Sequence, residues 1–308
     1  MKKILVTGGA GNVGSALVEG LLNKGYYVVV VDNLSTGSLD KLPQSTNLKF
    51  IKCDCNNYRD LAEVMLAFDF EFVFHYAAVV GVKRTQENPV SVLNDIKGIE
   101  NLLNLSKNTQ VKRVFFSSSS EVYGEPVELP QHETRTPLNS RVPYAVVKNV
   151  GESFFRSYKQ EFGLDYTIFR FFNTYGPNQS EDFVVAKFLR MAMNNEDITI
   201  YGDGKQTRTF CYVSDNVETC IKIMEEALYV NDVINIGGAD IWTIQDLAEK
   251  IIEITGSNSK IIYVDPLKEG DMARRQPDNT KMLNVLGRDL ITLEEGVKKM
   301  IKFYKNQQ

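Results

Sequence analysis

Short apolar runs rich in β-branched residues constrain this chain more than any other feature. Runs such as YYVVVVD (26–32) do not alternate with polar residues, which favours strands covered on both faces. Stretches with helical apolar spacing separate the runs, among them 12–25, 89–108 and 141–163. Strands that alternate with helices predict an α/β fold with a doubly wound parallel sheet.

The pattern loosens after about Pro177. Helices are expected at 181–194, 214–228, 243–255 and 292–305, with short strands between them. We therefore expect a larger sheet domain over 1–177 and a smaller α+β region over 178–308. No linker rich in Pro, Gly or Ser separates the two, so the boundary is soft and segments can interleave.

Charge and hydropathy argue against several classes of protein. A formal net charge of −4 does not supply the clustered basic charge of a nucleic-acid-binding protein. No apolar run reaches membrane-spanning length, and the opening MKKILVTGG loses its apolar character too soon for a signal peptide. We therefore expect a cytoplasmic protein with neither nucleic acid nor membrane as a partner.

The cysteines and histidines predict no metal site. The cysteines lack the paired spacing of zinc ligands and are interpreted as reduced structural thiols. His75 ends an apolar run and is predicted to be a hydrogen-bonded core residue, and His132 also lacks neighbouring ligands.

A glycine-rich turn joins the first apolar run to the first helical stretch. In VTGGAGNVGS, Gly8, Gly11 and Gly14 fall at G-x-x-G-x-x-G spacing. Glycine allows a tight turn there and lets backbone N–H groups approach a pyrophosphate at the start of a helix. Purely structural turns carry the same pattern, so the motif alone leaves both a turn and a ligand site open.

Asp32 favours a ligand site at the glycine turn. It ends the second apolar run, eighteen residues after Gly14, where an acid can accept hydrogen bonds from ribose hydroxyls. Residues 33–37, NLSTG, offer no Arg or Lys to a 2′-phosphate, which favours NAD over NADP. Asp54 ends the third run and can either meet the adenine or cap a turn. The predicted NAD contacts are Gly8, Gly11, Asn12, Val13, Gly14, Asp32, Asn33, Ser35, Thr36, Gly37, Asp54, Ala77, Ala78, Tyr144 and Lys148.

Tyr144 and Lys148 are four residues apart and share one face of a predicted helix. A cationic Lys148, with an oxidised nicotinamide nearby, is expected to lower the pKa of the Tyr144 phenol. Tyrosinate can then take a proton from a sugar hydroxyl as hydride leaves for the cofactor. The serine run in FFSSSSEVYG (115–124) ends an apolar run, where strand ends line the crevice of a doubly wound sheet. Taken alone, each motif also fits a solvated helix face or a turn.

Several stretches of the chain, in order, resemble one family. The extended short-chain dehydrogenase/reductases that modify nucleotide sugars are matched by TGGAGNVG, SSSSEVYG, Tyr144-x-x-x-Lys148, FRFFNTYGPNQ and YGDGKQTRTFCYVSDN. The resemblance covers nearly the whole chain. It implies a Rossmann domain that binds NAD and a smaller domain that binds a nucleoside diphosphate sugar. It also implies oxidation at the sugar C4, with Tyr144 as base, Lys148 on the ribose, and Ser119 as the hydrogen-bonding partner.

The resemblance also implies substrate contacts. Asn173 matches a residue that contacts the diphosphate or sugar, and Arg208 and Arg275 match positions that hold the diphosphate or nucleoside. Arg suits this task because its planar guanidinium offers several donors to phosphate oxygens, although a surface ion pair is the alternative for each. Ser120 and Lys83 complete the predicted substrate contacts, and for Lys83 a solvated loop charge is the alternative.

Two positions depart from the family pattern. Asn12 stands where an aromatic or aliphatic residue is usual, and Asp95, in NDIKGI, replaces the Asn of N-x-x-G-T. We expect neither to abolish NAD binding, but Asp95 puts the usual polar contact of that helix in doubt.

The step after C4 oxidation is open between several outcomes. The family's 4,6-dehydratases carry the pattern T-D-E-V-Y-G, with an Asp acid and a Glu base. Here Ser120 stands at the Asp position and Glu121 at the Glu position, so the Asp acid is missing and dehydration is disfavoured. SEVYG together with Arg275 in R-x-P-D resembles UDP-glucuronate decarboxylases, whereas the loop around Lys83 resembles the epimerases. We expect a 4-epimerase or a net C4 dehydrogenase, with a decarboxylase-like or dehydratase-like enzyme as the alternative. Glu121 is catalytic if chemistry occurs at C5.

The resemblance carries two further expectations. The helices around 91–108 and 142–162 correspond to those that form a homodimer in much of the family, and the expected role is in polysaccharide biosynthesis. A non-catalytic NAD sensor is a distant alternative, because such a protein would have no reason to keep Ser119, Tyr144 and Lys148 together.

Overall fold

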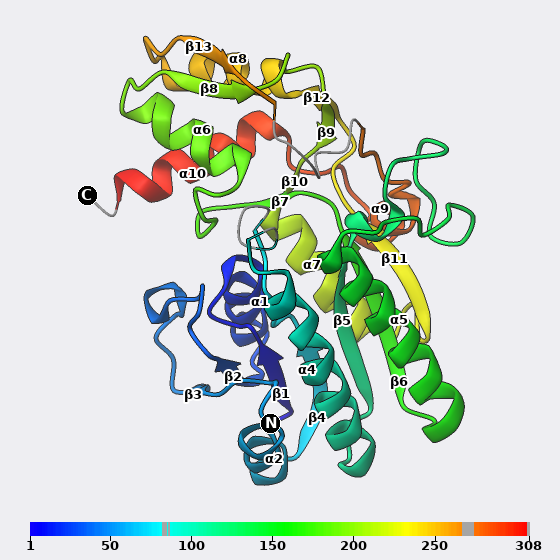
Figure 1. The fold of residues 1–308 in the computed structure, drawn as a ribbon. Helices are drawn as coiled ribbons and strands as arrows, with labels where there is room; N and C mark the ends of the chain where they lie inside the picture. Colours follow the sequence, from blue (N-terminus) through cyan, green and yellow to red (C-terminus); the bar gives the residue numbers. More distant parts are fainter. Residues whose placement is uncertain (82–84, 86, 267–273, 307–308) are drawn as a thin grey trace.

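The computed structural model describes residues 1–81, 85, 87–266 and 274–306. A seven-stranded parallel sheet forms the centre of the larger lobe (Figure 1), with the strand order β11-β6-β5-β4-β1-β2-β3. Its strands are β1 (Lys3–Thr7), β2 (Tyr27–Asp32), β3 (Leu48–Lys52), β4 (Phe70–His75), β5 (Arg113–Ser119), β6 (Asp165–Phe171) and β11 (Asp232–Ile236). The winding reverses between β1 and β4, and open α/β sheets bind ligands outside the carboxyl ends of the strands at such a point.

Helices cover both faces of this sheet. One face carries α1 (Asn12–Asn23), α7 (Val213–Glu225) and α9 (Thr280–Leu286), and the other carries α2 (Tyr58–Ala67), α4 (Pro89–Asn108) and α5 (Pro143–Phe162). Successive strand residues enter the two cores in turn: Ile4 and Val6 face one core, and Leu5 faces the other. Burial on both faces explains why the strands are continuous apolar runs, and the predicted doubly wound sheet is confirmed.

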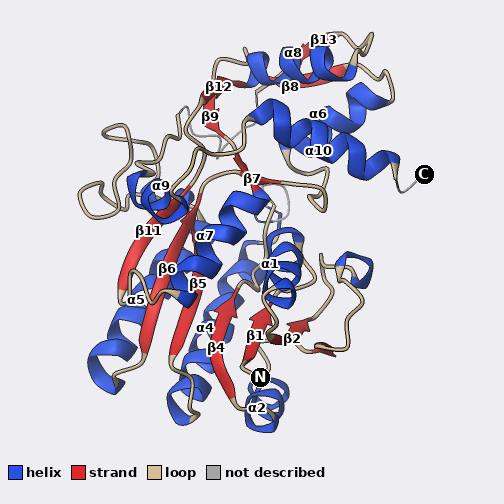
Figure 2. Cartoon of the chain, turned by 180° about the vertical axis from the view of Figure 1, so that it is seen from behind, coloured by secondary structure: helices blue, strands red, loops and turns tan. Residues whose placement is uncertain are grey.

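The smaller lobe lies beyond the carboxyl ends of the strands (Figures 1 and 2). It contains α6 (Val184–Met193), α8 (Ile244–Thr255) and α10 (Leu293–Lys305), with three strand pairs: β7 (Thr174–Tyr175) with β10 (Cys211–Tyr212), β8 (Ile198–Tyr201) with β13 (Ile261–Val264), and β9 (Thr207–Thr209) with β12 (Ile241–Thr243). Capping boxes begin α8 and α10, where Thr243 and Thr292 exchange hydrogen bonds with the acid three residues later.

The chain passes between the two lobes more than once. β11, α7 and α9 follow residue 178, yet they pack on the larger sheet, with β11 as the edge strand beside β6. Segments therefore interleave across the soft boundary, and a division of binding tasks at residue 177 stays a proposal.

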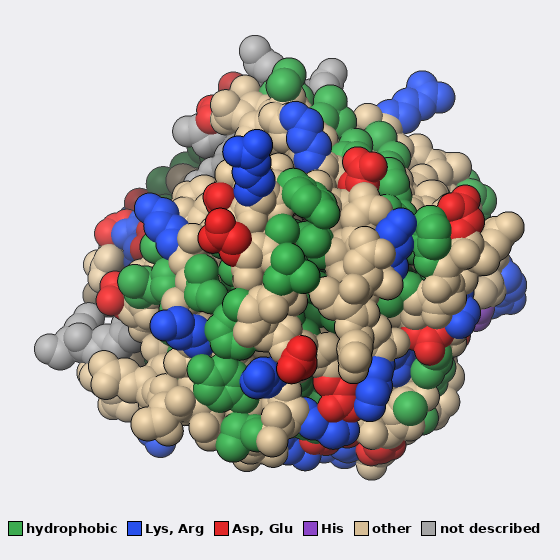
Figure 3. All heavy atoms as spheres, turned by 90° about the horizontal axis from the view of Figure 1, so that it is seen from below, with side chains coloured by type: hydrophobic (Ala, Val, Ile, Leu, Met, Phe, Trp, Pro, Cys, Tyr) green, Lys and Arg blue, Asp and Glu red, His purple; other side chains and the backbone are tan. Residues whose placement is uncertain are grey.

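The surface at the amino ends of the strands mixes charges of both signs. Figure 3 shows basic and acidic side chains side by side on this face. Glu71 lies between two exposed lysines, with its Oε1 3.1 Å from Lys2 Nζ and 3.0 Å from Lys112 Nζ. Such pairs contribute roughly 0–1 kcal/mol each, because water screens them. Among the described residues, no helix is both long enough and apolar enough to cross a membrane.

Candidate active site

A pocket of about 710 Å³ opens at the carboxyl ends of β1, β4 and β5 and extends into the smaller lobe. Its wall holds nearly all the residues that the sequence singles out, although they are far apart along the chain. The predicted residues on the wall are Gly8, Gly11, Asn12, Val13, Gly14, Asp32, Asn33, Ser35, Thr36, Asp54, Ala77, Ala78, Ser119, Ser120, Glu121, Tyr144, Lys148, Asn173 and Arg275.

The three glycines of the G-x-x-G-x-x-G motif after β1 have different roles. Gly8 has a φ of +68°, and a Cβ there would lie 2.6 Å from the backbone nitrogen of Ala77. A Cβ on Gly14 would lie 2.2 Å from the carbonyl oxygen of Gly8. Around Gly11 the closest described atom to a Cβ is that same oxygen, at 3.2 Å. The turn itself thus requires Gly8 and Gly14, whereas Gly11 leaves room on the pocket side.

Helix α1 presents its amino end to the pocket. It begins at Asn12 with Gly11 as its N-cap, and the residues from Gly11 to Gly14 line the pocket. The first N–H groups of a helix have no acceptor within the helix, and the helix dipole adds partial positive charge there. This amino end therefore fits the pyrophosphate of a dinucleotide.

Asp32, at the end of β2, binds the backbone of the glycine turn through its carboxylate. Its Oδ2 accepts the backbone N–H of Ala10 at 3.0 Å, and its Oδ1 accepts that of Leu34 at 2.8 Å. Each carboxylate oxygen can accept a second hydrogen bond, and Asp32 lines the pocket. Gly37, predicted as a direct NAD contact, is not part of the pocket wall. It packs against Asp32, because a Cβ there would lie 3.0 Å from both carboxylate oxygens.

Asp54 and Lys41 lie near Asp32, and of these two only Asp54 lines the pocket. Asp54 accepts a hydrogen bond from Asn33 Nδ2 at 3.2 Å and another from the Asn56 N–H at 2.9 Å, so it shapes a turn and also lines the pocket. Lys41, on the short helix η1 (Leu39–Lys41), lies close enough to Asp32 for that charge to oppose the lowering of the Lys41 pKa by burial. Lys41 lies four residues beyond the stretch NLSTG (33–37), so the sequence did not single it out.

The predicted catalytic residues come together between β5 and α5. The Ser119 hydroxyl lies close enough to the Tyr144 phenol to lower the pKa of that phenol. Lys148 is 3% exposed, and its Nζ lies 3.5 Å from the Ser117 hydroxyl and 5.6 Å from the centre of the Tyr144 ring. Because Tyr144 and Lys148 both line the pocket, the shared helix face points at a ligand site and not at solvent.

The pKa of Tyr144 is raised in the chain by itself, so its lowering by Lys148 together with an oxidised nicotinamide stays a prediction. Burial and the negative charge of Glu121 raise the Tyr144 pKa well above its ordinary value, and the Ser119 hydroxyl only partly opposes this. Burial also lowers the pKa of Lys148 to about 8, against the opposing charge of Asp95. Lys148 alone therefore does not make Tyr144 a base, and a further positive charge, such as an oxidised nicotinamide, is needed in the pocket.

Glu121 and Arg275 face each other in the pocket. Glu121 belongs to the short helix η2 (Ser120–Tyr123), and its Oε1 lies 3.5 Å from Arg275 Nη1. Within the described part of the chain, the buried Nε of Arg275 has no hydrogen-bond partner. The guanidinium thus keeps a donor for an oxygen of a bound ligand.

The remaining predicted substrate contacts differ in their placement. Asn173 has a φ of +34°, donates from Nδ2 to the Thr209 carbonyl at 3.0 Å, and lines the pocket. Ser120 is buried and also lines the pocket. Arg208 is buried in β9, which pairs with β12, and it does not belong to the pocket wall. Lys83 lies outside the described residues.

His75 is the hydrogen-bonded core residue that the sequence predicts. Its Nδ1 lies 2.8 Å from the hydroxyl oxygen of Thr7. Burial, reinforced by the charge of Lys148, lowers the His75 pKa to about 3, so the ring is neutral at physiological pH.

The pocket wall also contains residues that the sequence did not assign to the site. Asp95 on α4 accepts the backbone N–H of Val79 at 2.7 Å, and its motif departure was the only signal. Gln179, Phe183 and Phe210 enter the wall from the smaller lobe. Gln179 and Phe210 belong to the family-like stretches FRFFNTYGPNQ and YGDGKQTRTFCYVSDN but were given no role, and Phe183 carries no local signal. The packing of the two lobes brings all three to the pocket.

Residues 4–237 match the model of the NAD dependent epimerase/dehydratase family. The chain belongs to this family. The family's UDP-glucose 4-epimerase from Thermotoga maritima, solved with UDP-glucose, is 34% identical, with a TM-score of 0.93 over 99% of each chain. The UDP-glucose 4-epimerase from Thermus thermophilus, solved with NAD, is 28% identical, with a TM-score of 0.91 over 99% of this chain and 100% of that chain. The UDP-N-acetyl-alpha-D-glucosaminuronate decarboxylase of Bacillus cytotoxicus is 34% identical over 319 residues, covering 99% of this chain and 98% of the relative.

The family's cofactor is NAD, and the pocket fits it. Space at Gly11 and the amino end of α1 suit the pyrophosphate, and Asp32 suits a ribose. The resemblance to the extended short-chain dehydrogenase/reductases is therefore confirmed.

Proposed function

We propose that the chain oxidises the C4 hydroxyl of a nucleoside diphosphate sugar and acts as a nucleotide-sugar 4-epimerase. The observation that carries the proposal is that Ser119, Tyr144 and buried Lys148 lie together on the wall of the pocket that adjoins the glycine turn. NAD, when bound, supplies the acceptor for the C4 hydride and the hydride that returns.

The residues of the chain handle the proton. Tyr144 accepts it from the C4 hydroxyl, and the nearby Ser119 hydroxyl stabilises the tyrosinate, since it lowers the Tyr144 pKa. Lys148 binds a ribose hydroxyl and adds positive charge beside the phenol. Burial keeps water from competing for these contacts, since Ser119 and Lys148 are both less than a tenth exposed.

The smaller lobe provides the contacts proposed for the nucleotide. Asn173 and Arg275 bring donors to the pocket for diphosphate or sugar oxygens, and Phe183 and Phe210 bring apolar surface for the base. A UDP-sugar is the first candidate, because the Thermotoga maritima relative was solved with UDP-glucose.

The Glu121–Arg275 pair supports a second candidate, a UDP-glucuronate decarboxylase-like activity. A 4-keto sugar with a C6 carboxylate is a β-keto acid, which loses carbon dioxide readily, and Arg275 can bind that carboxylate. However, Glu121 already offsets the charge of Arg275, which weakens the attraction for an anionic sugar. This favours a neutral sugar and the epimerase.

Incubation of the NAD-loaded protein with a panel of nucleotide sugars tests the proposal, with mass spectrometry and NADH absorbance as readouts. We expect an isomer of unchanged mass from a neutral UDP-sugar. Loss of carbon dioxide from a UDP-uronic acid would support the second candidate, the decarboxylase-like activity. Loss of two hydrogens from the sugar, with accumulation of NADH, would identify a net C4 dehydrogenase. Loss of water would select a dehydratase. No product from any sugar, with NAD bound, would favour the sensor.

We also propose that the chain forms a homodimer through α4 and α5. Val90 and Leu93 on α4 and Val146 on α5 are exposed apolar side chains on the two helices. Light scattering should give twice the chain mass, and Leu93→Lys should shift it toward one chain. The cytoplasmic location and the role in polysaccharide biosynthesis stay predictions from the resemblance.

A further inference from the structure

A buried polar network lies behind the pocket wall. Arg170, on β6, donates from Nε to Glu152 Oε1 at 2.8 Å and from Nη2 to Glu152 Oε2 at 2.7 Å. Glu152 also accepts the hydroxyl of Ser118 at 2.7 Å. Glu152 lies one turn after Lys148 on α5, and Ser118 precedes Ser119 on β5. The ion pair therefore joins the helix and the strand that carry the proposed catalytic residues.

The network continues from Arg170 toward the substrate side. Arg170 Nη1 donates to the hydroxyl of Tyr123 at 2.8 Å, and that hydroxyl donates to Asn235 Oδ1 at 2.7 Å. Tyr123 belongs to η2, two residues after Glu121, and Asn235 belongs to β11. Arg170, Tyr123 and Asn235 are 1%, 0% and 0% exposed, so water does not replace these hydrogen bonds.

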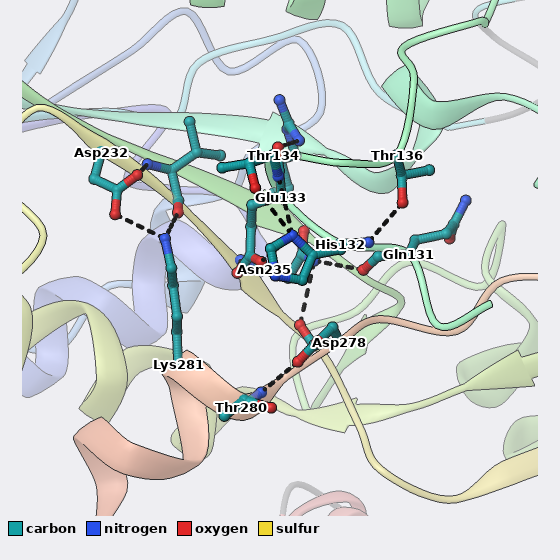
Figure 4. A network of polar contacts seen from close by, with 12 residues as sticks. Gln131, His132, Glu133, Thr134, Thr136, Asp232, Asn235, Asp278, Thr280 and Lys281 are labelled. Atoms are coloured by element: carbon teal, nitrogen blue, oxygen red, sulfur yellow. Dashed lines mark hydrogen bonds and ion pairs between the residues drawn. The ribbon is translucent and has the colours of Figure 1, made fainter. Parts of the chain in front are cut away.

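Asn235 holds two further segments together, as Figure 4 shows. Its Nδ2 donates to the Gln131 carbonyl at 2.9 Å and to the Asp278 carbonyl at 3.2 Å. The Gln131 N–H donates to the Gln276 carbonyl, and the Asp278 N–H donates to the Gln131 carbonyl, each at 2.8 Å. Segment 276–278 directly follows Arg275, so Asn235 fixes the backbone on which Arg275 stands.

We propose that Tyr123 and Asn235 are positioning residues that set where Arg275 lies relative to Glu121. The hydrogen bonds of Tyr123 hold η2, which carries Glu121, and those of Asn235 hold the segment next to Arg275. Neither Tyr123 nor Asn235 lines the pocket, so both act through other residues. The proposal rests on the proposed function, in which Arg275 contacts the nucleotide sugar.

Tyr123→Phe tests this role with the loss of one oxygen atom. The ring keeps its contact with Phe172, so the fold should persist. We expect the KM for the nucleotide sugar and the Kd for UDP to rise about tenfold, a cost typical of a lost buried hydrogen bond. The Kd for NAD should stay within twofold, because the glycine turn and Asp32 are outside the network. The matched control is Tyr26→Phe, which removes a hydroxyl that donates to Glu225 at 3.1 Å and lies away from this network.

A double-mutant cycle with Arg275→Gln separates positioning from general stability. If Tyr123 acts through Arg275, then Tyr123→Phe should have little further effect on the KM or the Kd for UDP once Arg275 is replaced. Asn235→Asp, which turns a donor into an acceptor facing two carbonyl oxygens, should behave in the same way with a larger effect. If Asn235→Asp does not fold, Tyr123→Phe alone decides.

Several results would overturn the positioning role. Tyr123→Phe could match Tyr26→Phe in KM and in UDP affinity, or it could weaken NAD and UDP binding equally. Its effect could also stay tenfold in the Arg275→Gln background. A wild-type protein that binds NAD but neither binds UDP nor converts any nucleotide sugar would instead defeat the proposed function, and the positioning role with it.

Discussion

The carboxylate of Asp95 accepts the backbone N–H of Val79 at 2.7 Å, which fastens α4 to the loop after β4 at the edge of the pocket. The polar contact left in doubt by the departure from N-x-x-G-T is therefore present. Asp95 differs from the usual Asn in charge, and that charge acts on both Lys148 and Tyr144. The charge of Asp54 and a hydrogen bond from the side chain of Asn56 also act on the pKa of Asp95. The charges of Glu121 and Arg275 also act on the pKa of Tyr144.

Asp95→Asn should move the pH–rate profile to lower pH. The charge of Asp95 raises the pKa values of both Lys148 and Tyr144, so its removal lowers both. With the positive nicotinamide of NAD bound to lower the Tyr144 pKa, the acidic limb of kcat reports proton loss from Tyr144 and the basic limb reports proton loss from Lys148. Both limbs should therefore shift in the same direction. The measurement is kcat from pH 5 to 10. Glu100→Gln, farther along α4 and away from the pocket wall, is the control, and limbs that stay in place would contradict the expectation.

Gly11→Ala should weaken NAD binding, whereas Gly14→Ala should lower the stability of the fold. At Gly14 a Cβ would lie 2.2 Å from the Gly8 carbonyl oxygen, so the turn cannot close and the Tm should fall by several degrees. At Gly11 the same oxygen is 3.2 Å away and φ is −80°, so the fold should tolerate Ala while NAD affinity falls at least tenfold. Calorimetry with NAD and thermal melts without it distinguish the two. Equal loss of Tm in both variants would mean that Gly11 is structural too.

Tyr144→Phe should lower turnover by roughly 10²–10⁴, the usual contribution of a general base. NAD should still bind, because the glycine turn and Asp32 are unchanged. Sugar-dependent reduction of bound NAD, followed by absorbance, is the measurement. Survival of that reduction at the wild-type rate would exclude Tyr144 as the base.

Glu152→Gln should cost about 3–5 kcal/mol of the free energy of unfolding, because it leaves the Arg170 guanidinium buried beside a neutral amide. Despite burial, the pairing with Arg170 holds the Glu152 pKa below its ordinary value. The stabilisation is therefore complete above the unfolded pKa, near 4.3, and is lost as the pH falls through the folded value. Urea unfolding at pH 7 and at low pH should show the gap between variant and wild type narrowing in acid. Glu249→Gln, an exposed carboxylate on α8, should change little at either pH.

Elements with a strong local pattern could be predicted from the sequence. Residues 89–108 carry enough helical turns to define α4, and Thr243 marks the start of α8 through its capping box. α2 and α9 were not predicted. α9 (Thr280–Leu286) is too short for its apolar residues to show a period, and packing on β11 stabilises it.

The same distinction applies to the site. Tyr144 and Lys148 are found from spacing because one helix presents both. Arg208 and Arg275 look alike in sequence, yet the fold places Arg275 on the pocket wall and Arg208 in the buried β9. Lys41 reaches Asp32 only because η1 folds back, which is a tertiary effect.

The late position of β11 has a consequence for how chains of this kind can diverge. β11 and α7 complete the cofactor-binding sheet, although much of the smaller lobe precedes them in the chain. Recombination at a single junction near residue 177 would bring in a foreign edge strand along with a foreign substrate lobe, and that strand would have to fit β6. Such chains therefore acquire new substrates more readily by replacing pocket side chains and surface loops than by exchanging whole halves.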